Sequence, residues 1–368
     1  RVRPGAMNMT TSDTARANVS GALDVLRRAM KERGVDALYV TYPANVRYLT
    51  GFSTPKDASV LVLQDRAVMF TDGRYTAQAA EEALVPYEIT SEVDSRVAEL
   101  VGGGRLGVEP EHMTLQRHAR LTERLGAAPV PVEGLVATQR LVKLPHELDL
   151  LREAARITDA AFAAALEFIR EGVTEAEVAL EIERAMRLAG ADGPGFDTIV
   201  ASGVRGAMPH GTASQKRIGH GELVTLDFGA AFRGYHADMT RTVAVGEVGA
   251  EERRMYEAVL EAQQLAVDAI APGKSGRELD AVARDALAGH GLAEAFAHSL
   301  GHGTGLEIHE GPRLSQRSSD VLRPGMVVTV EPGVYVPGFT GLRIEDLVLV
   351  TEDGHEVLSR SPKHLIAL

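Results

Sequence analysis

The sequence predicts an α+β protein in which a smaller α/β domain precedes a larger α+β domain. In the first third, short apolar runs typical of strands alternate with helical patterns. A stretch with Pro129, Pro131 and Gly134 then interrupts the pattern, as linkers do. Beyond it, two long helical patterns come before a series of strands, an order typical of α+β domains. We therefore expect an N-terminal domain at residues 10–135 and a C-terminal domain at residues 136–368.

The elements of the N-terminal domain follow from side-chain spacing. A helix is predicted from near Ser20, because Leu23, Leu26 and Met30 recur at helical spacing, and Gly34 can end it. Runs rich in β-branched and aromatic residues predict strands at 37–40, 59–63 and 67–70, and a helix is predicted at 76–84.

The C-terminal domain is predicted to begin with two helices and to continue with strands. The helical patterns cover residues 146–170 and 175–189. Strands follow, interrupted by one helical block at about 250–290. We therefore expect the functional side chains of this domain to lie mainly on strands and on the loops between them.

One glycine-rich stretch resembles a phosphate-binding motif. Gly102, Gly104 and Gly107 in GGGRLG fit the spacing G-x-G-x-x-G. The nucleotide-binding form of this motif needs a strand before it and a helix after it. Here a helical segment precedes the glycines and the strand-like LGVEP follows. We interpret the stretch as a flexible turn and assign it no nucleotide.

Composition excludes several classes of function. The formal net charge of −12, from 51 acidic and 39 basic residues, argues against a nucleic-acid partner. No apolar run reaches the roughly 20 residues of a membrane helix, and the first ten residues lack the apolar core of a signal peptide. The absence of cysteine excludes disulfides and thiolate chemistry and fits a cytoplasmic protein. We interpret Met7 or Met9 as the natural start.

Two aspartates lie in a stretch that otherwise reads as a buried hairpin, TLDFGAAFRGYHADMTRT. Asp227 is flanked by apolar strand residues, and Asp238 follows eleven residues later in a segment predicted to continue as a strand through Val243. Either aspartate alone could stabilise a turn or face solvent. As a pair in apolar strands they would repel each other and resist burial unless a cation sat between them.

Further polar side chains follow the same pattern. Glu331 ends an apolar strand, and Glu345 is predicted inside the strand at 341–350, on the same face as Arg343 and opposite to Asp346. His302 lies in SLGHGTG, where alternate glycines predict a loop with little side-chain bulk. For a single loop histidine taken alone, exposure to solvent is the simpler explanation.

Together, four carboxylates and one imidazole form an oxygen-rich set of metal ligands. Four negative charges balance two divalent cations, whereas one cation would leave two buried charges uncompensated. Such ligands favour Mn²⁺, Co²⁺ or Fe²⁺ over a cysteine-type structural zinc site, although Zn²⁺ stays open. Paired metals about 3.5–4 Å apart can activate a water molecule, which indicates hydrolysis.

In order and local context, these residues resemble the metallopeptidases of the pita-bread fold, family M24. Within that group the chain is similar to the Xaa-Pro peptidases, prolidase and aminopeptidase P. The resemblance rests on the two aspartates and on HSLGHGTGLEIHEGP, EPGVYV and GLRIED, and it covers residues 147–368. A weaker similarity to the creatinase/prolidase N-terminal domain rests on YPANVRYLTGF and FTDGRY. It implies a pita-bread catalytic domain after a smaller α/β domain.

The resemblance also implies roles for individual residues. The ligands of two divalent ions, most simply Mn²⁺, would be Asp227, Asp238, His302, Glu331 and Glu345, with Asp238 and Glu345 bridging the ions. The catalytic groups beside them would be His210, His309, Glu331 and Arg343, with Glu331 as proton shuttle. His298, Phe196 and Tyr335 would contact the substrate in the proline pocket, and Arg47 is a candidate for binding a dipeptide carboxylate. His112, His118, His236 and His290 are assigned no role.

The activity that the resemblance implies is hydrolysis of the bond between an N-terminal residue and proline by metal-activated hydroxide. A dipeptidase is slightly favoured over an aminopeptidase P that acts on longer peptides. A metal-dependent hydrolase of a small non-peptide molecule is a further alternative. Creatinase-like enzymes and metal-free binding relatives would lack the acidic ligands, and all five ligands are present here. The resemblance also suggests a cytoplasmic homodimer with no membrane or nucleic-acid partner.

Overall fold

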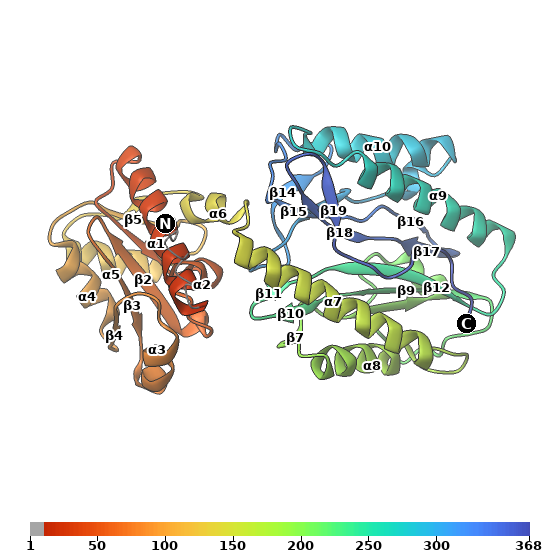
Figure 1. Cartoon of the computed structure of the whole chain (residues 1–368), viewed down its shortest axis with the longest axis horizontal. Helices are drawn as coiled ribbons and strands as arrows, with labels where there is room; N and C mark the ends of the chain where they lie inside the picture. Colours follow the sequence, from red (N-terminus) through yellow and green to blue (C-terminus); the bar gives the residue numbers. More distant parts are fainter. Residues whose placement is uncertain (1–10) are drawn as a thin grey trace, which may run out of the picture. The chain divides into compact units, whose positions relative to one another are not determined.

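The computed structural model describes residues 11–368, so Met7 and Met9 lie outside the described part. The chain divides into an N-terminal unit that ends at Arg140 and a C-terminal unit that begins at Leu141 (Figure 1). The division falls at the end of helix α6 (Leu135–Arg140), whose first residue is the last residue of the predicted N-terminal domain.

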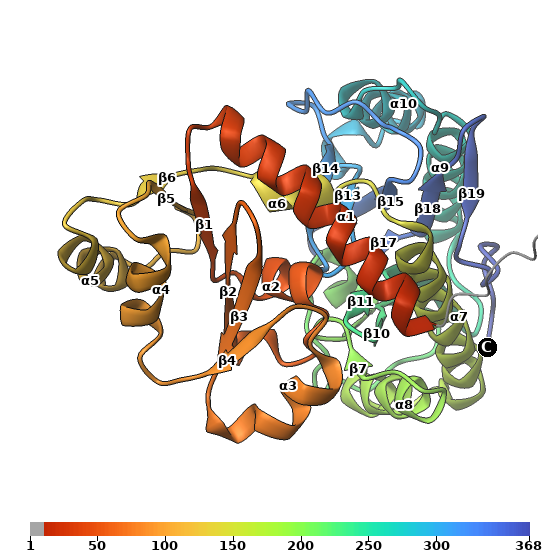
Figure 2. The ribbon, with the colours of Figure 1, turned by 60° about the vertical axis from the view of Figure 1, so that its left-hand side comes forward.

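The N-terminal unit contains a six-stranded sheet covered by helices on both faces (Figure 2). Its strands, in spatial order, are β4 (Tyr87–Ile89), β3 (Ala67–Thr71), β2 (Ala58–Leu63), β1 (Ala37–Val40), β5 (Leu106–Val108) and β6 (Val130–Pro131). One face packs against α1 (Thr11–Glu32), α2 (Pro43–Thr50) and α6, and the other against α4 (Val93–Val101) and α5 (Leu115–Leu125). The short α3 (Thr76–Glu82) precedes β4.

Side-chain alternation explains these layers. In β1, Leu38 and Val40 belong to the core beneath α1 and α2, whereas Ala37 and Tyr39 belong to the core beneath α4 and α5. A strand buried on both faces carries a continuous apolar run, which is why the sequence pattern was clear. The predicted α/β class and the strands near 37–40, 59–63 and 67–70 are confirmed.

Two local predictions in this unit have different outcomes. Helix α1 begins at Thr11, well before the predicted start near Ser20, because its first turns are polar and show no apolar spacing. The glycine-rich stretch does lie between α4 and β5, so the order of elements is opposite to that of a nucleotide-binding motif. Gly102 and Gly103 have φ values of 58° and 86°, which glycine adopts readily in such a turn.

The C-terminal unit is built from two pairs of helices with strands between them. Helices α7 (Pro145–Phe168) and α8 (Glu175–Leu188) lie on one side of the strands in Figure 1, and α9 (Ala250–Asp268) and α10 (Gly276–Gly289) lie on the other. Each pair packs on its own apolar core. The helical block predicted at about 250–290 is confirmed in extent, but it consists of two helices and not one. Pro272 and Gly273, with φ of 84°, end the helical path between α9 and α10.

The strands between these helices form four small sheets. Under α7 and α8 lie β8 (Ile199–Ser202), β9 (Glu222–Phe228) and β12 (Met239–Val245), and beside them β7 (Gly193–Pro194), β10 (Ala230–Phe232) and β11 (Tyr235–His236). The second half holds β14 (Glu310–Leu314), β13 (Gly301–Gly303), β15 (Val327–Val330), β18 (Asp346–Val350) and β19 (His355–Val357). A separate hairpin joins β16 (Gly333–Val336) to β17 (Thr340–Arg343).

The hairpin that carries the two aspartates is confirmed, with one change. β9 and β12 pair antiparallel, with Asp227 opposite Thr240. Asp238 does not lie inside a strand but just before β12, because the chain between β9 and β12 forms the extension β10–β11. At the base of this extension, a Cβ atom on Gly229 would lie 1.8 Å from the carbonyl oxygen of Ala237.

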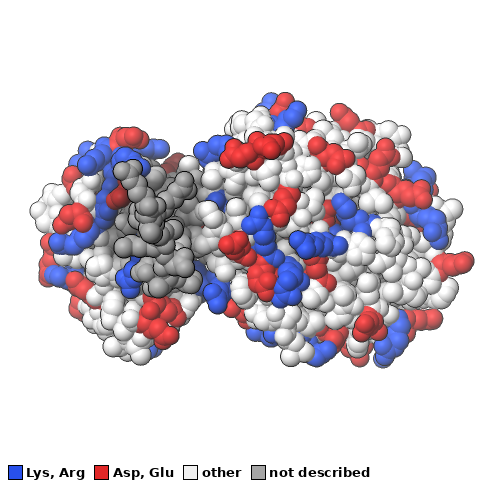
Figure 3. Space-filling view, in the orientation of Figure 1, with Lys and Arg blue, Asp and Glu red and all other residues white. Residues whose placement is uncertain are grey.

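The helices and one face of the surface can be compared with the classes that composition argues against. No helix in residues 11–368 is long and apolar enough to cross a membrane. On the face drawn in Figure 3, acidic and basic side chains are interspersed, and no large basic patch of the kind that binds nucleic acid is visible there.

The close approach at Gly229 leads to a stability prediction. Replacing Gly229 with alanine should lower the free energy of unfolding by about 1–3 kcal/mol, because the methyl group would overlap the Ala237 carbonyl. Gly289→Ala is the matched control, since a Cβ at that helical position meets no atom within 4 Å. It should leave stability unchanged or raise it by up to about 1 kcal/mol. Urea unfolding measures both, and equal effects would contradict the prediction.

Candidate metal centre

Most of the predicted site residues line one cavity of about 360 Å³ in the C-terminal unit. They come from segments far apart in the sequence and meet between the two halves of the unit. The lining residues are Phe196, Ile199, Pro209, His210, Asp227, Asp238, His298, Ser299, His302, Ile308, His309, Arg313, Glu331, Arg343 and Glu345.

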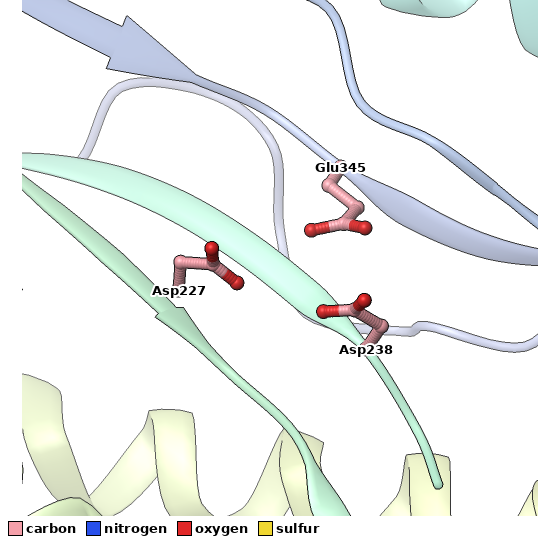
Figure 4. Close-up of side chains that lie close together, drawn as sticks. All are labelled: Asp227, Asp238 and Glu345. Atoms are coloured by element: carbon pink, nitrogen blue, oxygen red, sulfur yellow. The ribbon is translucent and has the colours of Figure 1, made fainter. Parts of the chain in front are cut away.

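Three buried carboxylates form the centre of this site. Asp227 lies near the end of β9, Asp238 just before β12, and Glu345 between β17 and β18. Each offers an oxygen atom, and these three atoms lie within 4.8 Å of one another. Figure 4 shows the three side chains pointing into the same space, the aspartates from the green segments and Glu345 from the blue one.

The segment around Glu345 is not the continuous strand that the sequence predicted. β17 pairs with β16 and ends at Arg343, whereas β18 pairs with β15 and begins at Asp346. Between them the Glu345 amide donates to the carbonyl oxygen of Thr240 at 3.1 Å. The chain therefore changes its pairing partner at Glu345, as it does at Asp238. Each acid enters the site from such a junction, because strand alternation no longer constrains its direction there.

The electrostatics of the three acids fit a bound cation. Burial, together with the charges of neighbouring acids, raises the pKa of Asp238 and of Glu345 well above their usual ranges. The buried oxygens Asp227 Oδ1 and Glu345 Oε1 have no hydrogen-bond partner among the described residues. A buried carboxylate oxygen without a partner is costly in free energy. Hard divalent cations bind oxygen ligands of this kind and would remove that cost. The donor set therefore fits metal ions.

His302 lies on a short strand and not in the loop that its glycine neighbours predicted. A Cβ atom on Gly301 would lie 2.0 Å from the carbonyl oxygen of Thr329 in β15, and one on Gly303 would lie 1.9 Å from that of Gly311 in β14. Only glycine fits at these two positions. The Nδ1 atom of His302 donates to the Gly303 carbonyl at 3.0 Å. That bond directs Nε2 toward the acids, at 3.3 Å from Glu331 Oε1 and 3.6 Å from Asp238 Oδ2.

Glu331 follows β15 directly, and its pKa is shifted in the opposite direction from that of the other acids. Burial alone would raise its pKa, but the hydrogen bond to His302 and the charges of His302, His298 and Arg343 lower it to about 2. Thr329 also donates to Glu331 Oε1 at 3.2 Å. Glu331 is therefore ionised at neutral pH, and its carboxylate is available to a cation beside His302 Nε2.

Arg343 connects the acids to the substrate-pocket residues. Its Nη2 donates to Asp227 Oδ2 at 2.5 Å, and its Nη1 donates to the Tyr335 hydroxyl at 2.6 Å. The Tyr335 hydroxyl also lies 2.9 Å from His298 Nε2. Tyr335 is not among the lining residues, so it acts behind the cavity wall, whereas His298 lines the cavity itself.

The sequence interpretation missed Thr240, which contacts two site residues. Its hydroxyl donates to Glu345 Oε2 at 2.7 Å and accepts from Arg343 Nε at 3.0 Å. A signal for it was present, because Thr240 is two residues beyond Asp238 and pairs with Asp227 across the hairpin. Arg313, which also lines the cavity, was missed as well, and its exposed strand position gives no comparable signal.

The remaining predicted residues lie in different surroundings. His210 and Phe196 line the cavity, and the ring of His309 lies 4.4 Å from that of His302. Partial burial and the charge of His302 lower the pKa of His309. Arg47 belongs to the N-terminal unit, on α2, where its Nη1 donates to the Ser53 carbonyl at 3.2 Å.

The raised pKa of Asp238 predicts that Asp238→Asn stabilises the metal-free protein and destabilises the metal-bound protein. After chelation at pH 7, Asp238→Asn should have a free energy of unfolding about 1–3 kcal/mol higher than the unsubstituted chain, because it removes a buried carboxyl whose ionisation the neighbouring acids oppose. With excess Mn²⁺ the order should reverse, since the amide binds metal less well.

The pH dependence gives an internal control for this experiment. When a carboxyl has a raised pKa in the folded state, the protein loses stability as pH rises from the unfolded pKa through the folded pKa. Below about pH 4 the carboxyl is protonated in both states, so the gain from Asp238→Asn should vanish there. Asp353→Asn, at an exposed position, should show neither effect. A variant that is less stable than the unsubstituted chain in both states would contradict the prediction.

Two family models match the chain. Residues 149–352 match metallopeptidase family M24, and residues 23–142 match the creatinase/prolidase N-terminal domain. These matches cover the two units described above and confirm the resemblance inferred from the sequence.

Individual relatives agree over nearly the whole chain. The solved structure of an Xaa-Pro dipeptidase from Bacillus anthracis is 46% identical, with a TM-score of 0.92 over 95% of this chain and 100% of that one. An Xaa-Pro dipeptidase from Pyrococcus furiosus is 39% identical over 94% of this chain and 99% of its own length. The X-Pro aminopeptidase from Thermotoga maritima is 36% identical, with a TM-score of 0.87 over 93% and 100% of the two chains. The chain therefore belongs to metallopeptidase family M24.

Proposed function

We propose that this protein is a metal-dependent Xaa-Pro dipeptidase, which hydrolyses the bond between an N-terminal residue and proline. The observation that carries the proposal is the buried cluster of Asp227, Asp238 and Glu345, with two oxygens that lack partners, in a cavity that also holds three further histidine side chains beside His302. The similarity to Xaa-Pro dipeptidases over almost the full chain supports the substrate class.

The metal-binding residues would be the four acids and one imidazole predicted from the sequence. Two divalent ions, for which we propose Mn²⁺, would polarise the scissile carbonyl and lower the pKa of a water molecule when bound. Asp227 is oriented by Arg343 and Glu345 by Thr240, so each would present its remaining oxygen to the ions. His302 would contribute Nε2, because its Nδ1 is engaged by the Gly303 carbonyl.

The substrate would be handled by the histidines and Glu331. His210 and His309 reach the cavity from two loops, where either imidazole can donate to the oxyanion that forms at the attacked carbonyl. Glu331 is ionised and can accept a proton at a carboxylate oxygen and pass it to the proline nitrogen. That nitrogen carries no N–H in the peptide, so Phe196 and His298 would select proline by shape, with Tyr335 holding His298 in place.

The main alternative is an aminopeptidase P that accepts longer peptides, which the similarity to the X-Pro aminopeptidase of Thermotoga maritima supports. Both activities need the same metal centre and differ in what limits the space beyond proline. Hydrolysis of a small non-peptide molecule is a more distant alternative. A cytoplasmic location and a homodimeric assembly stay predictions, which fractionation and light scattering of the purified protein would test.

The substrate assay separates these activities. Chelator-treated protein should not cleave Ala-Pro or Met-Pro, and addition of Mn²⁺ should restore cleavage of both dipeptides but not of an Xaa-Pro-Xaa tripeptide. Chromatographic detection of free proline measures the reaction. Cleavage of the tripeptide would establish the aminopeptidase instead. Metal binding without cleavage of any of the three would reject both peptidase readings.

His309→Ala should lower kcat by about 100-fold while metal content is kept, because the ring faces the cavity but is not one of the proposed ligands. Metal analysis and steady-state kinetics on the same preparation separate the two effects. His290→Ala, which removes a surface histidine at the end of α10, is the control and should leave kcat unchanged. Full activity of His309→Ala would remove His309 from the mechanism.

Arg47→Ala tests the proposed carboxylate contact. If Arg47 binds the carboxylate of a dipeptide, its loss should raise KM for Ala-Pro by about tenfold or more, since a charge-assisted hydrogen bond disappears. The neighbouring exposed variant Lys56→Ala is the control for loss of one positive charge on the same unit. Unchanged dipeptide hydrolysis by Arg47→Ala would exclude this residue from substrate binding.

A further inference from the structure

The loop that carries His210 begins at Ser202, the last residue of β8, and reaches the start of α8 at Ser214. The 3₁₀ helix η3 (Gly203–Ala207) lies within it. His210 is exposed on the cavity side, and its ring makes no hydrogen bond within the described part of the chain. No hydrogen bond therefore fixes the imidazole directly. Its position depends on how firmly the backbone of the 202–214 loop is held.

One buried carboxylate holds both ends of this loop. Glu175 is the first residue of α8 and is completely buried. Its Oε1 accepts hydrogen bonds from the Ser202 amide at 2.8 Å and from the Ser202 hydroxyl at 2.9 Å. Its Oε2 accepts from the Ser214 amide at 3.1 Å and from the Ser214 hydroxyl at 2.6 Å. Glu175 thus joins two points that are twelve positions apart in the chain.

The interior of the loop is tied to the same carboxylate. Arg205 donates from Nε to Glu175 Oε2 at 3.0 Å and from Nη2 to the Thr212 carbonyl at 2.7 Å. A guanidinium paired with a buried carboxylate forms a strong, directional contact. Arg205 therefore braces the loop on both sides of His210.

These bonds are not required to cap the helix. The N-terminus of α8 has its own capping box, in which Thr174 accepts from the Glu177 amide and Glu177 accepts from Thr174. The carboxylate of Glu175 instead points away from the helix, to the loop. Since the helix end does not need this carboxylate, its hydrogen bonds serve the loop at 202–214.

The opposite side of the loop contacts the metal centre. Arg343, which donates to Asp227, also donates from Nη1 to the Pro209 carbonyl at 3.3 Å, and Thr340 donates to the Gly203 carbonyl at 3.1 Å. The loop is therefore held between α8 and β17, and Pro209, the residue before His210, is hydrogen-bonded to Arg343 of the site.

We infer that Glu175 is a positioning residue, which closes the 202–214 loop and thereby holds His210 at the cavity. The inference rests on the proposed role of His210 in catalysis. Glu175 touches neither substrate nor metal ligands, and it acts through the loop backbone.

The first test needs no activity. Glu175→Gln keeps the size of the side chain but turns an NH₂ group against some of the donors from Ser202, Ser214 and Arg205. In metal-free protein, the amides of residues 202–214 should exchange hydrogen about tenfold faster in this variant. Glu177→Gln is the matched control, because it lies in the same helical turn, contacts Thr174, and glutamine also completes a capping box. Unchanged exchange in the loop of Glu175→Gln would overturn the inference.

The second test shows whether the effect reaches the site through His210. Glu175→Gln should lower kcat/KM for Ala-Pro by about 10- to 100-fold with metal content unchanged, because a displaced catalytic group loses its alignment. In the His210→Ala background the same substitution should have no further effect. An equal loss in both backgrounds would mean that Glu175 serves stability in general, and the inference would be rejected.

A second variant covers the case in which Glu175→Gln does not fold. Ser214→Ala removes only the hydroxyl bond to Glu175 and should shift exchange and kcat/KM in the same direction by a smaller factor. No change in either quantity would count against the inference. If the unsubstituted protein cleaves no Xaa-Pro peptide, the proposed function fails while the exchange result still decides whether Glu175 holds the loop.

Discussion

The burial of several carboxylates in one space is the constraint on which the rest of the C-terminal unit depends. Asp227, Asp238 and Glu345 repel one another and resist losing their water, so their positions must be maintained against both effects. Arg343 and Thr240 provide part of that support through hydrogen bonds from within the core. Divalent cations would provide the rest, which explains why two carboxylate oxygens have no hydrogen-bond partner within residues 11–368.

Two kinds of support surround this centre. The acids and His302 come from strands, or from the points where strands change partners, and sheet pairing fixes them. His210 and His309 come from loops, and buried polar contacts hold those loops. Glu175 holds the first loop. In the second, Glu310 directly follows His309 and forms a buried ion pair with Lys143 at 2.7 Å. The proposed metal ligands thus lie on strands or at strand junctions, whereas the two histidines proposed to contact the substrate lie on separately anchored loops.

The sequence predicted elements wherever apolar side chains recur at a regular spacing. The strands around Leu38 and the helices α7 and α8 could be read in this way, because a core imposes its period on any element that packs against it. The start of α1 and the break between α9 and α10 could not, since the first is polar and the second depends on two residues, Pro272 and Gly273, inside a helical pattern. Of the site, the three clustered acids and His302 were identified from the sequence, but Thr240 was missed because a threonine in a strand has an equally ordinary role in packing.

By itself the sequence determined the chemistry available to this protein. It specified four acids and a histidine in apolar surroundings, the order in which they occur, and hence their family. Only the tertiary structure decided the geometry. It placed Asp238 and Glu345 at strand junctions, put His302 on a strand that only glycine neighbours permit, and brought Glu175 to both ends of the His210 loop. The reason is physical: residue type and spacing report burial and local conformation, whereas the meeting of distant segments depends on how sheets and helices pack.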